Sequence, residues 1–81
     1  MKLASIYKTD IKEIKKIMID RGIGTMTELS EKSGVNRNTL SQVLSGESQP
    51  SSDVMDKLVS ALNIEPEKAG HIFFSLNLRN K

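Results

Sequence analysis

The sequence contains no cysteine and no tryptophan, and aromatic residues make up only 4% of it. Without cysteine the chain can form neither disulfide bonds nor thiolate metal sites, so its stability has to come from packing. No apolar run is as long as a bilayer-spanning helix, and the first eight residues are too short and too polar for a secretory signal. We therefore expect a cytoplasmic protein with no membrane partner.

The 81 residues suffice for one small domain with a single core, which leaves little room for a deep enclosed active site. A formal net charge of +2 is compatible with a nucleic-acid partner but is too small to indicate one by itself. Basic residues are concentrated in the segment 1–21, which holds five lysines and one arginine against three acidic residues. Two interpretations of this segment stay open: a phosphate-seeking arm, or ordinary solvated lysines on a helix face.

Apolar residues recur at helical spacing in five segments, and no strand-like alternation precedes Phe74. We expect a first helix between Thr9 and Gly22, a second from Thr25 to near Ser33, a third from Arg37 to Gly46, a fourth after Ser51 or Ser52 with Asn63 as its terminal cap, and a fifth beginning at Glu65–Pro66. The predicted fold class is therefore all-α. The five helices would form one domain, residues 9–74, between an N-terminal arm (1–8) and a C-terminal tail (75–81).

The segment from about 26 to 46 carries the strongest local signals. Thr25 and Glu28 have the spacing of a capping box, and Gly34 offers the left-handed conformation that ends a helix. Asn36 is a good N-cap for a helix that starts almost without a loop. Two short, separately capped helices joined by a tight turn indicate a helix-turn-helix unit.

The third helix is expected to bury one face and expose the other. Its inward residues would be Leu40, Val43 and Leu44, which leaves Asn38, Gln42 and Ser45 on the outward face and Arg37 at its rim. Asn and Gln can pair bidentately with adenine, and Arg with guanine, in a major groove wide enough to admit one helix. The competing interpretation is an ordinary polar helix surface. The coincidence of cap, turn and uncharged hydrogen-bonding side chains favours DNA reading.

The stretch TMTELSEKSGVNR at 25–37 is followed by TLS at 39–41, Ser45–Gly46, Pro50–Ser51, and the apolar residues Leu58, Ala61, Leu62 and Ile64. With these motifs, residues from about 11 to 73 resemble the lambda repressor/Cro-like (XRE-type) helix-turn-helix family. The resemblance implies a five-helix lambda repressor-like domain that binds operator DNA, usually as a symmetric dimer. It places base-reading residues at Arg37, Asn38, Thr39, Ser41 and Gln42. It places phosphate contacts at Thr25, Met26 and Asn36, and at the backbone amides of Glu47, Ser48 and Gln49.

Three positions depart from the family pattern. Met26 stands where glutamine is common, so a side-chain hydrogen bond to phosphate is lost there, and Glu47 stands where a basic residue is frequent. Some relatives join the first and third helices by a buried ion pair, for which this chain offers Met18 or Ile19 against Leu44. We expect an apolar contact there, which is often no less stabilising than a buried ion pair.

These observations predict a transcriptional regulator, a Cro/repressor-type protein that binds double-stranded DNA at a palindromic operator as a homodimer. The alternative is a helix-turn-helix module that binds protein, such as an antitoxin or adaptor, which the weak basicity around Arg37 slightly favours. No arrangement of side chains indicates an enzyme, a cofactor, a small-molecule substrate or a metal, since His71 is the single histidine.

The tail carries Phe74, Leu76 and Leu78 in alternation with polar residues. One hypothesis is that this tail packs on a second copy, as an added strand or an extension of the fifth helix, and so forms the dimer. The other is that it folds back onto its own domain.

Overall fold

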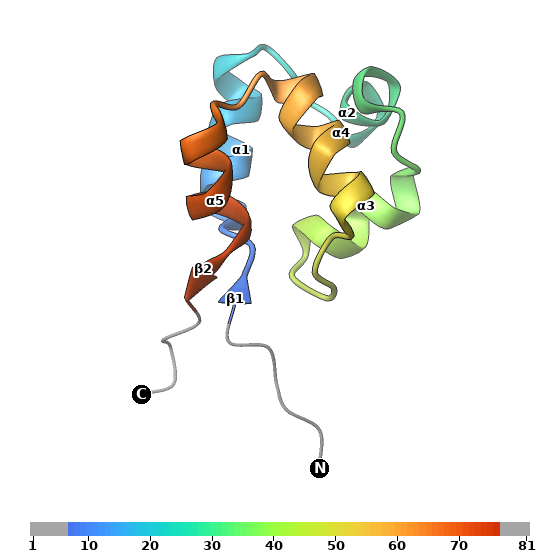
Figure 1. Cartoon of the computed structure of the whole chain (residues 1–81). Coiled ribbons are helices and arrows are strands. Elements are labelled where there is room, and N and C mark those ends of the chain that lie inside the picture. The colour runs from blue at the N-terminus through green and yellow to red at the C-terminus, as the bar shows by residue number, and fades with distance from the viewer. Residues whose placement is uncertain (1–6, 77–81) are drawn as a thin grey trace.

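The computed structural model describes residues 7–76, and within this range the chain forms five helices and one pair of very short strands (Figure 1). In chain order the elements are β1 (Tyr7–Lys8), α1 (Ile11–Asp20), α2 (Met26–Ser33), α3 (Arg37–Leu44), α4 (Ser52–Leu62), α5 (Pro66–Phe73) and β2 (Ser75–Leu76). The expected all-α class with five helices is confirmed.

Every helix contributes to one hydrophobic core. Its most completely buried side chains are Ile14 of α1, Leu29 of α2, Leu40 of α3, Leu58 and Leu62 of α4, and Phe73 of α5. Burial of such side chains is the main favourable term in folding a chain without disulfides. Because α2 and α3 are only eight residues long, their stability depends on this shared core rather than on helix propensity.

The strands join the two ends of the described chain. β1 and β2 pair antiparallel, with Tyr7 opposite Leu76 and Lys8 opposite Ser75. The amide of Asp10 also donates to the carbonyl of Ile72. The entry to α1 and the exit from α5 therefore lie side by side at one end of the molecule (Figure 1).

This pairing extends just beyond the range 9–74 expected for the helical domain. Ser75–Leu76 bind the same chain's Tyr7–Lys8 instead of extending α5, so the start of the tail folds onto its own domain. The folded unit includes these four residues, which the boundaries at 9 and 74 had left out. Residues 1–6 of the expected arm and 77–81 of the expected tail lie outside the described range.

The limits of two helices are fixed by local bonds. The first helix begins at Ile11, inside the expected range, because the Asp10 carboxylate accepts the Glu13 amide and acts as the N-cap. The last residue of the third is Leu44, and the left-handed Gly46 that terminates it follows two residues later. Among residues 7–76, no helix is long and apolar enough to cross a membrane.

Candidate nucleic-acid interface

The start of α2 is fixed by the capping box expected from the sequence. The Thr25 hydroxyl accepts the Glu28 amide at 3.1 Å, and the Glu28 carboxylate accepts the amides of Gly24 at 2.7 Å and Thr25 at 3.2 Å. These reciprocal bonds satisfy donors that a helix N-terminus otherwise leaves unpaired. Both phosphate contacts expected here are at this end of α2: Thr25 is exposed, whereas Met26 is half-buried and packs against the core.

The chain reverses at Gly34, as expected. This residue has φ 77° and ends α2, with its amide donating to the Ser30 carbonyl at 2.8 Å. The Ser30 hydroxyl donates to the Val35 carbonyl at 2.7 Å and so ties the turn back to α2. Val35 is buried, and the Asn36 side chain accepts the Asn38 amide as the N-cap of α3. The hydrogen bonds of the turn and the buried side chain of Val35 thereby fix the orientation of α3 relative to α2.

Helix α3 exposes the polar face predicted for it. Leu40, Val43 and Leu44 are at most 5% exposed. The residues expected to read bases include Arg37, Asn38, Ser41 and Gln42, which are exposed, and Thr39, which is half-buried. Amide side chains carry both a donor and an acceptor, and a guanidinium carries donors only, so this face can form paired hydrogen bonds with a base edge.

The C-terminal end of α3 closes on itself. Gly46 has φ 86°, and the amides of both Glu47 and Ser48 donate to the carbonyl of Gln42, at 2.9 Å and 3.2 Å. This is the hydrogen-bond pattern of a Schellman motif, with the Gly46 amide bound to Val43. The amides of Glu47 and Ser48, which were expected to contact phosphate, are therefore hydrogen-bonded to the end of α3. Their side chains remain exposed beside the end of α3.

Gln49 was expected to contact phosphate through its backbone amide, and its side chain is bound elsewhere. Its side-chain Nε2 donates to the Phe73 carbonyl at 2.7 Å, and its Oε1 accepts the Thr9 hydroxyl at 3.1 Å. The side chain thus binds within the domain.

Helix α1 supplies a residue that the sequence analysis did not single out. Lys15 lines a hollow of about 250 Å³ together with Thr25 and Met26, so it lies on the same surface as the start of α2. A spacing signal was present, because Lys15 lies three residues before Met18, whose side chain lines the same hollow. Arg21, in contrast, is committed to the fold. Its guanidinium donates to the carbonyls of Leu62 and Asn63 at the end of α4.

The apolar contact between the first and third helices is formed by Met18. Met18 and Leu44 are both buried in the core and line the same hollow. Ile19, the alternative partner, is 75% exposed.

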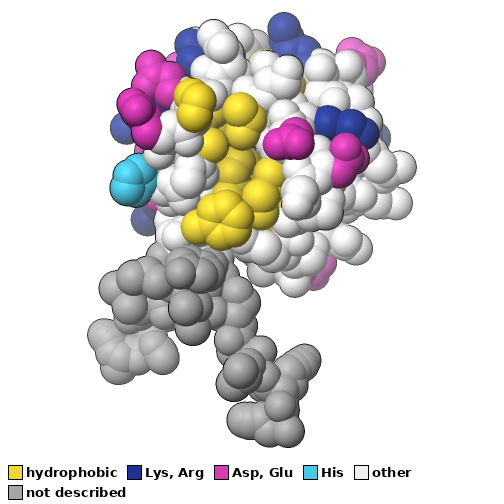
Figure 2. Space-filling model, viewed as in Figure 1, with side chains coloured by type: hydrophobic (Ala, Val, Ile, Leu, Met, Phe, Trp, Pro, Cys, Tyr) yellow, Lys and Arg dark blue, Asp and Glu magenta, His cyan; other side chains and the backbone are white. Residues whose placement is uncertain are grey.

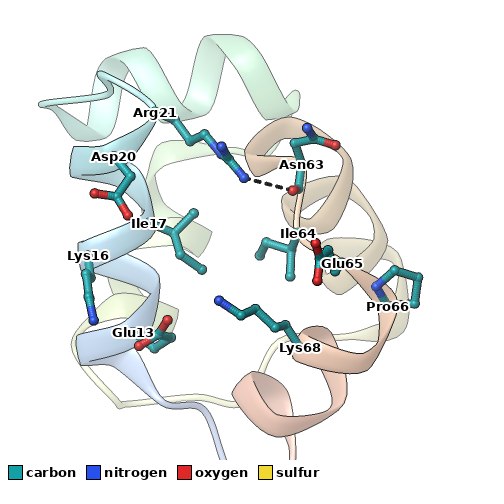
Figure 3. A pocket seen from close by; sticks show the side chains of 10 residues that line it. All are labelled: Glu13, Lys16, Ile17, Asp20, Arg21, Asn63, Ile64, Glu65, Pro66 and Lys68. Atoms are coloured by element: carbon teal, nitrogen blue, oxygen red, sulfur yellow. Dashed lines mark hydrogen bonds between the residues drawn. The ribbon is translucent and has the colours of Figure 1, made fainter.

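A larger hollow of about 650 Å³ lies between α1 and the turn that joins α4 to α5 (Figure 3). It is lined by side chains of both charges, among them Lys16, Arg21 and Glu65, and by no residue of α2 or α3. Within the part of the chain that the structure describes, no group of histidine, aspartate or glutamate side chains could hold a metal ion.

The model of the Cro/C1-type HTH DNA-binding domain matches residues 13–68. The chain belongs to this family. The matched range runs from the first turn of α1 into α5 and contains every residue expected to contact DNA, whereas β1 and β2 lie outside it. No curated protein and no solved structure matches the chain. Membership of the Cro/C1-type family supports DNA binding by a regulator.

Proposed function

We propose that this Cro/C1-type domain is a transcriptional repressor that binds a specific double-stranded operator, with α3 in the major groove. The observation that carries the proposal is the division of α3 into a buried apolar face and an exposed face bearing Arg37, Asn38 and Gln42. A solvated helix surface usually carries Lys and Glu, whereas these side chains suit base edges. Each bidentate pairing contributes about 1–3 kcal/mol of discrimination against the wrong base.

Phosphate contacts would position this helix. Thr25 and Asn36 lie at the N-termini of α2 and α3, where the helix dipole favours an anion. Lys15 adds a positively charged residue beside the start of α2. The Asn36 Oδ1 is occupied by its cap bond, but its amide nitrogen is a donor that a phosphate oxygen can accept.

A palindromic operator would require two copies of the domain. On the face viewed in Figure 1, hydrophobic side chains gather in one exposed strip (Figure 2). Phe74, which follows α5, is 50% exposed, and α4 and α5 contribute the partly buried Met55, Val59 and Ala69. We propose that the homodimer forms through a surface that includes Phe74.

The test of DNA binding is a titration with random duplex DNA at several salt concentrations. Binding driven by phosphates weakens steeply with salt, by a slope of about 0.9 per phosphate neutralised. A protein-binding antitoxin or adaptor would have no appreciable affinity for any duplex, and that result would refute the proposal.

Two neighbouring lysines provide a matched comparison in the same titration. We expect Lys15→Gln to lower the salt slope by about one, because Lys15 lies beside the start of α2. Lys16→Gln makes the same charge change but faces the hollow between α1 and α5, so its slope should stay at the wild-type value. Equal salt slopes for the two variants would show that Lys15 does not contact a phosphate.

A further inference from the structure

The side chain of Gln49 joins three parts of the chain that are distant in sequence. It lies in the loop after α3 and binds Phe73, 24 residues away, and Thr9, 40 residues away. The polarity of the amide matches its partners: a carbonyl oxygen can only accept, so Nε2 faces Phe73, and the Thr9 hydroxyl then donates to Oε1. Both hydrogen-bonding ends of the amide are therefore used within the domain.

Both partners lie at the junction where the two ends of the domain meet, next to the paired strands β1 and β2. We call this junction the seam. Phe73 is the last residue of α5, and its carbonyl is one of those that a helix C-terminus leaves without an intrahelical partner. Thr9 is only 5% exposed and is the one buried polar residue among residues 8–75. A buried hydroxyl or carbonyl left unbonded is costly, so each has a reason to hold the Gln49 amide.

The loop that Gln49 anchors is the direct continuation of α3. At its first end, the amides of Glu47 and Ser48 are bound to the carbonyl of Gln42, within the helix itself. At its other end, Gln49 is bound to the seam and the next residue, Pro50, is buried. The segment 45–50 thus connects the exposed face of α3 to the junction of α1 and α5 through hydrogen bonds at both ends.

We infer that Gln49 is a positioning residue for DNA recognition, which holds the C-terminal end of α3 against the seam through Thr9 and Phe73. This inference rests on the proposed DNA binding and concerns the side chain of Gln49, whereas the phosphate contact expected for this residue was that of its backbone amide. Thr9 and Phe73 both lie outside the range 13–68 matched by the family model, so the anchor uses residues beyond that common region. Loss of the anchor would loosen the helix orientation that base reading needs, without removing any group that touches DNA.

The experiment compares variants that remove the hydrogen bonds and keep the side-chain shape. Gln49→Met keeps the chain length without either bond, and Thr9→Val keeps the branching without the hydroxyl. Thr9→Ser, which retains the donor, is the control. Affinities for a site selected by the wild type and for random duplex are measured where circular dichroism shows each variant to be folded.

We expect Gln49→Met and Thr9→Val each to lower the preference for the selected site by about 3- to 10-fold. This factor corresponds to the net free energy of one or two hydrogen bonds. Random-duplex affinity and its salt slope should not change, and Thr9→Ser should behave as the wild type. The double variant should be no worse than Gln49→Met alone, because both substitutions break one network. In the free protein, the Glu47 and Ser48 amides should exchange faster in both variants.

Two outcomes would overturn the inference. If Gln49→Met weakens binding to random duplex as much as to the selected site and Thr9→Val has no effect, Gln49 contacts phosphate directly. If both variants lose thermal stability but keep full site preference, the bonds serve folding only. Should the wild type bind no duplex at all, the proposed function fails and the role in DNA recognition falls with it. The exchange measurement on the free protein still decides separately whether Gln49 holds the loop.

Discussion

At the residue scale, the exposed carboxylate of Glu47 should weaken DNA binding, because its negative charge repels phosphates. Glu47 lies in the turn after α3, and the hydrogen bond from its backbone amide to the Gln42 carbonyl holds it there. We expect Glu47→Gln to raise affinity for any duplex by roughly 2- to 5-fold, the strength of one exposed charge interaction. Glu67→Gln on α5 makes the same charge change at another exposed position and serves as the control. A titration in which both variants gain equally would show that only net charge matters.

The roles of single residues were predictable where their partners are close in sequence. Thr25, Asn36 and Gly34 act as expected, because a cap or a left-handed turn depends on bonds spanning two to four residues. Gln49 was not predictable, because its partners lie in segments that only the folded chain brings together. The Glu47 and Ser48 amides are a different case, because their partner is the nearby carbonyl of Gln42 and Gly46 is the local signal of the motif that binds them.

At the scale of elements, the turn at Gly34 decides how α3 is presented. A Cβ at Gly34 would meet no atom within 4 Å, so Gly34→Ala is opposed by its φ of 77° alone. We expect a loss of about 1–2 kcal/mol in the free energy of unfolding, measured by urea denaturation. Gly70→Ala is the matched control. It too has open space, but it lies inside α5 without a positive φ, so we expect a gain of about 0.5–1 kcal/mol. Equal effects at the two sites would contradict the assigned role of Gly34.

The helices were predictable as elements and the strands were not. Each helix has an apolar stripe and at least one local boundary signal, such as the left-handed Asn63 that ends α4. The strands are only two residues long, and their pairing depends on the register between Tyr7 and Leu76 rather than on a pattern within either segment. Alternation near Phe74 suggested a strand, but it could not distinguish pairing within the chain from pairing with a second copy.

At the scale of the whole molecule, residues 8–75 include two large exposed hydrophobic residues on which to test dimer formation. Phe74 is 50% exposed and belongs to the proposed dimer surface, whereas Ile19 is 75% exposed on α1. We expect Phe74→Ser to raise the dimer dissociation constant by about 10- to 100-fold, as loss of a buried aromatic side chain requires. Ile19→Ser should leave it unchanged. Sedimentation equilibrium measures both, and a wild type that stays monomeric at every concentration would refute the dimer.

The central claim is that the outward face of α3 reads base sequence. Selection of binding sites from a random DNA pool, carried out in parallel with the wild type and Gln42→Ala, tests it most directly. We predict that the wild type selects a defined site and that Gln42→Ala loses preference at one base pair in each half-site, by about 1–3 kcal/mol. Identical selected sites for the two proteins would contradict the assignment of Gln42, and the absence of any selected site would contradict the claim as a whole.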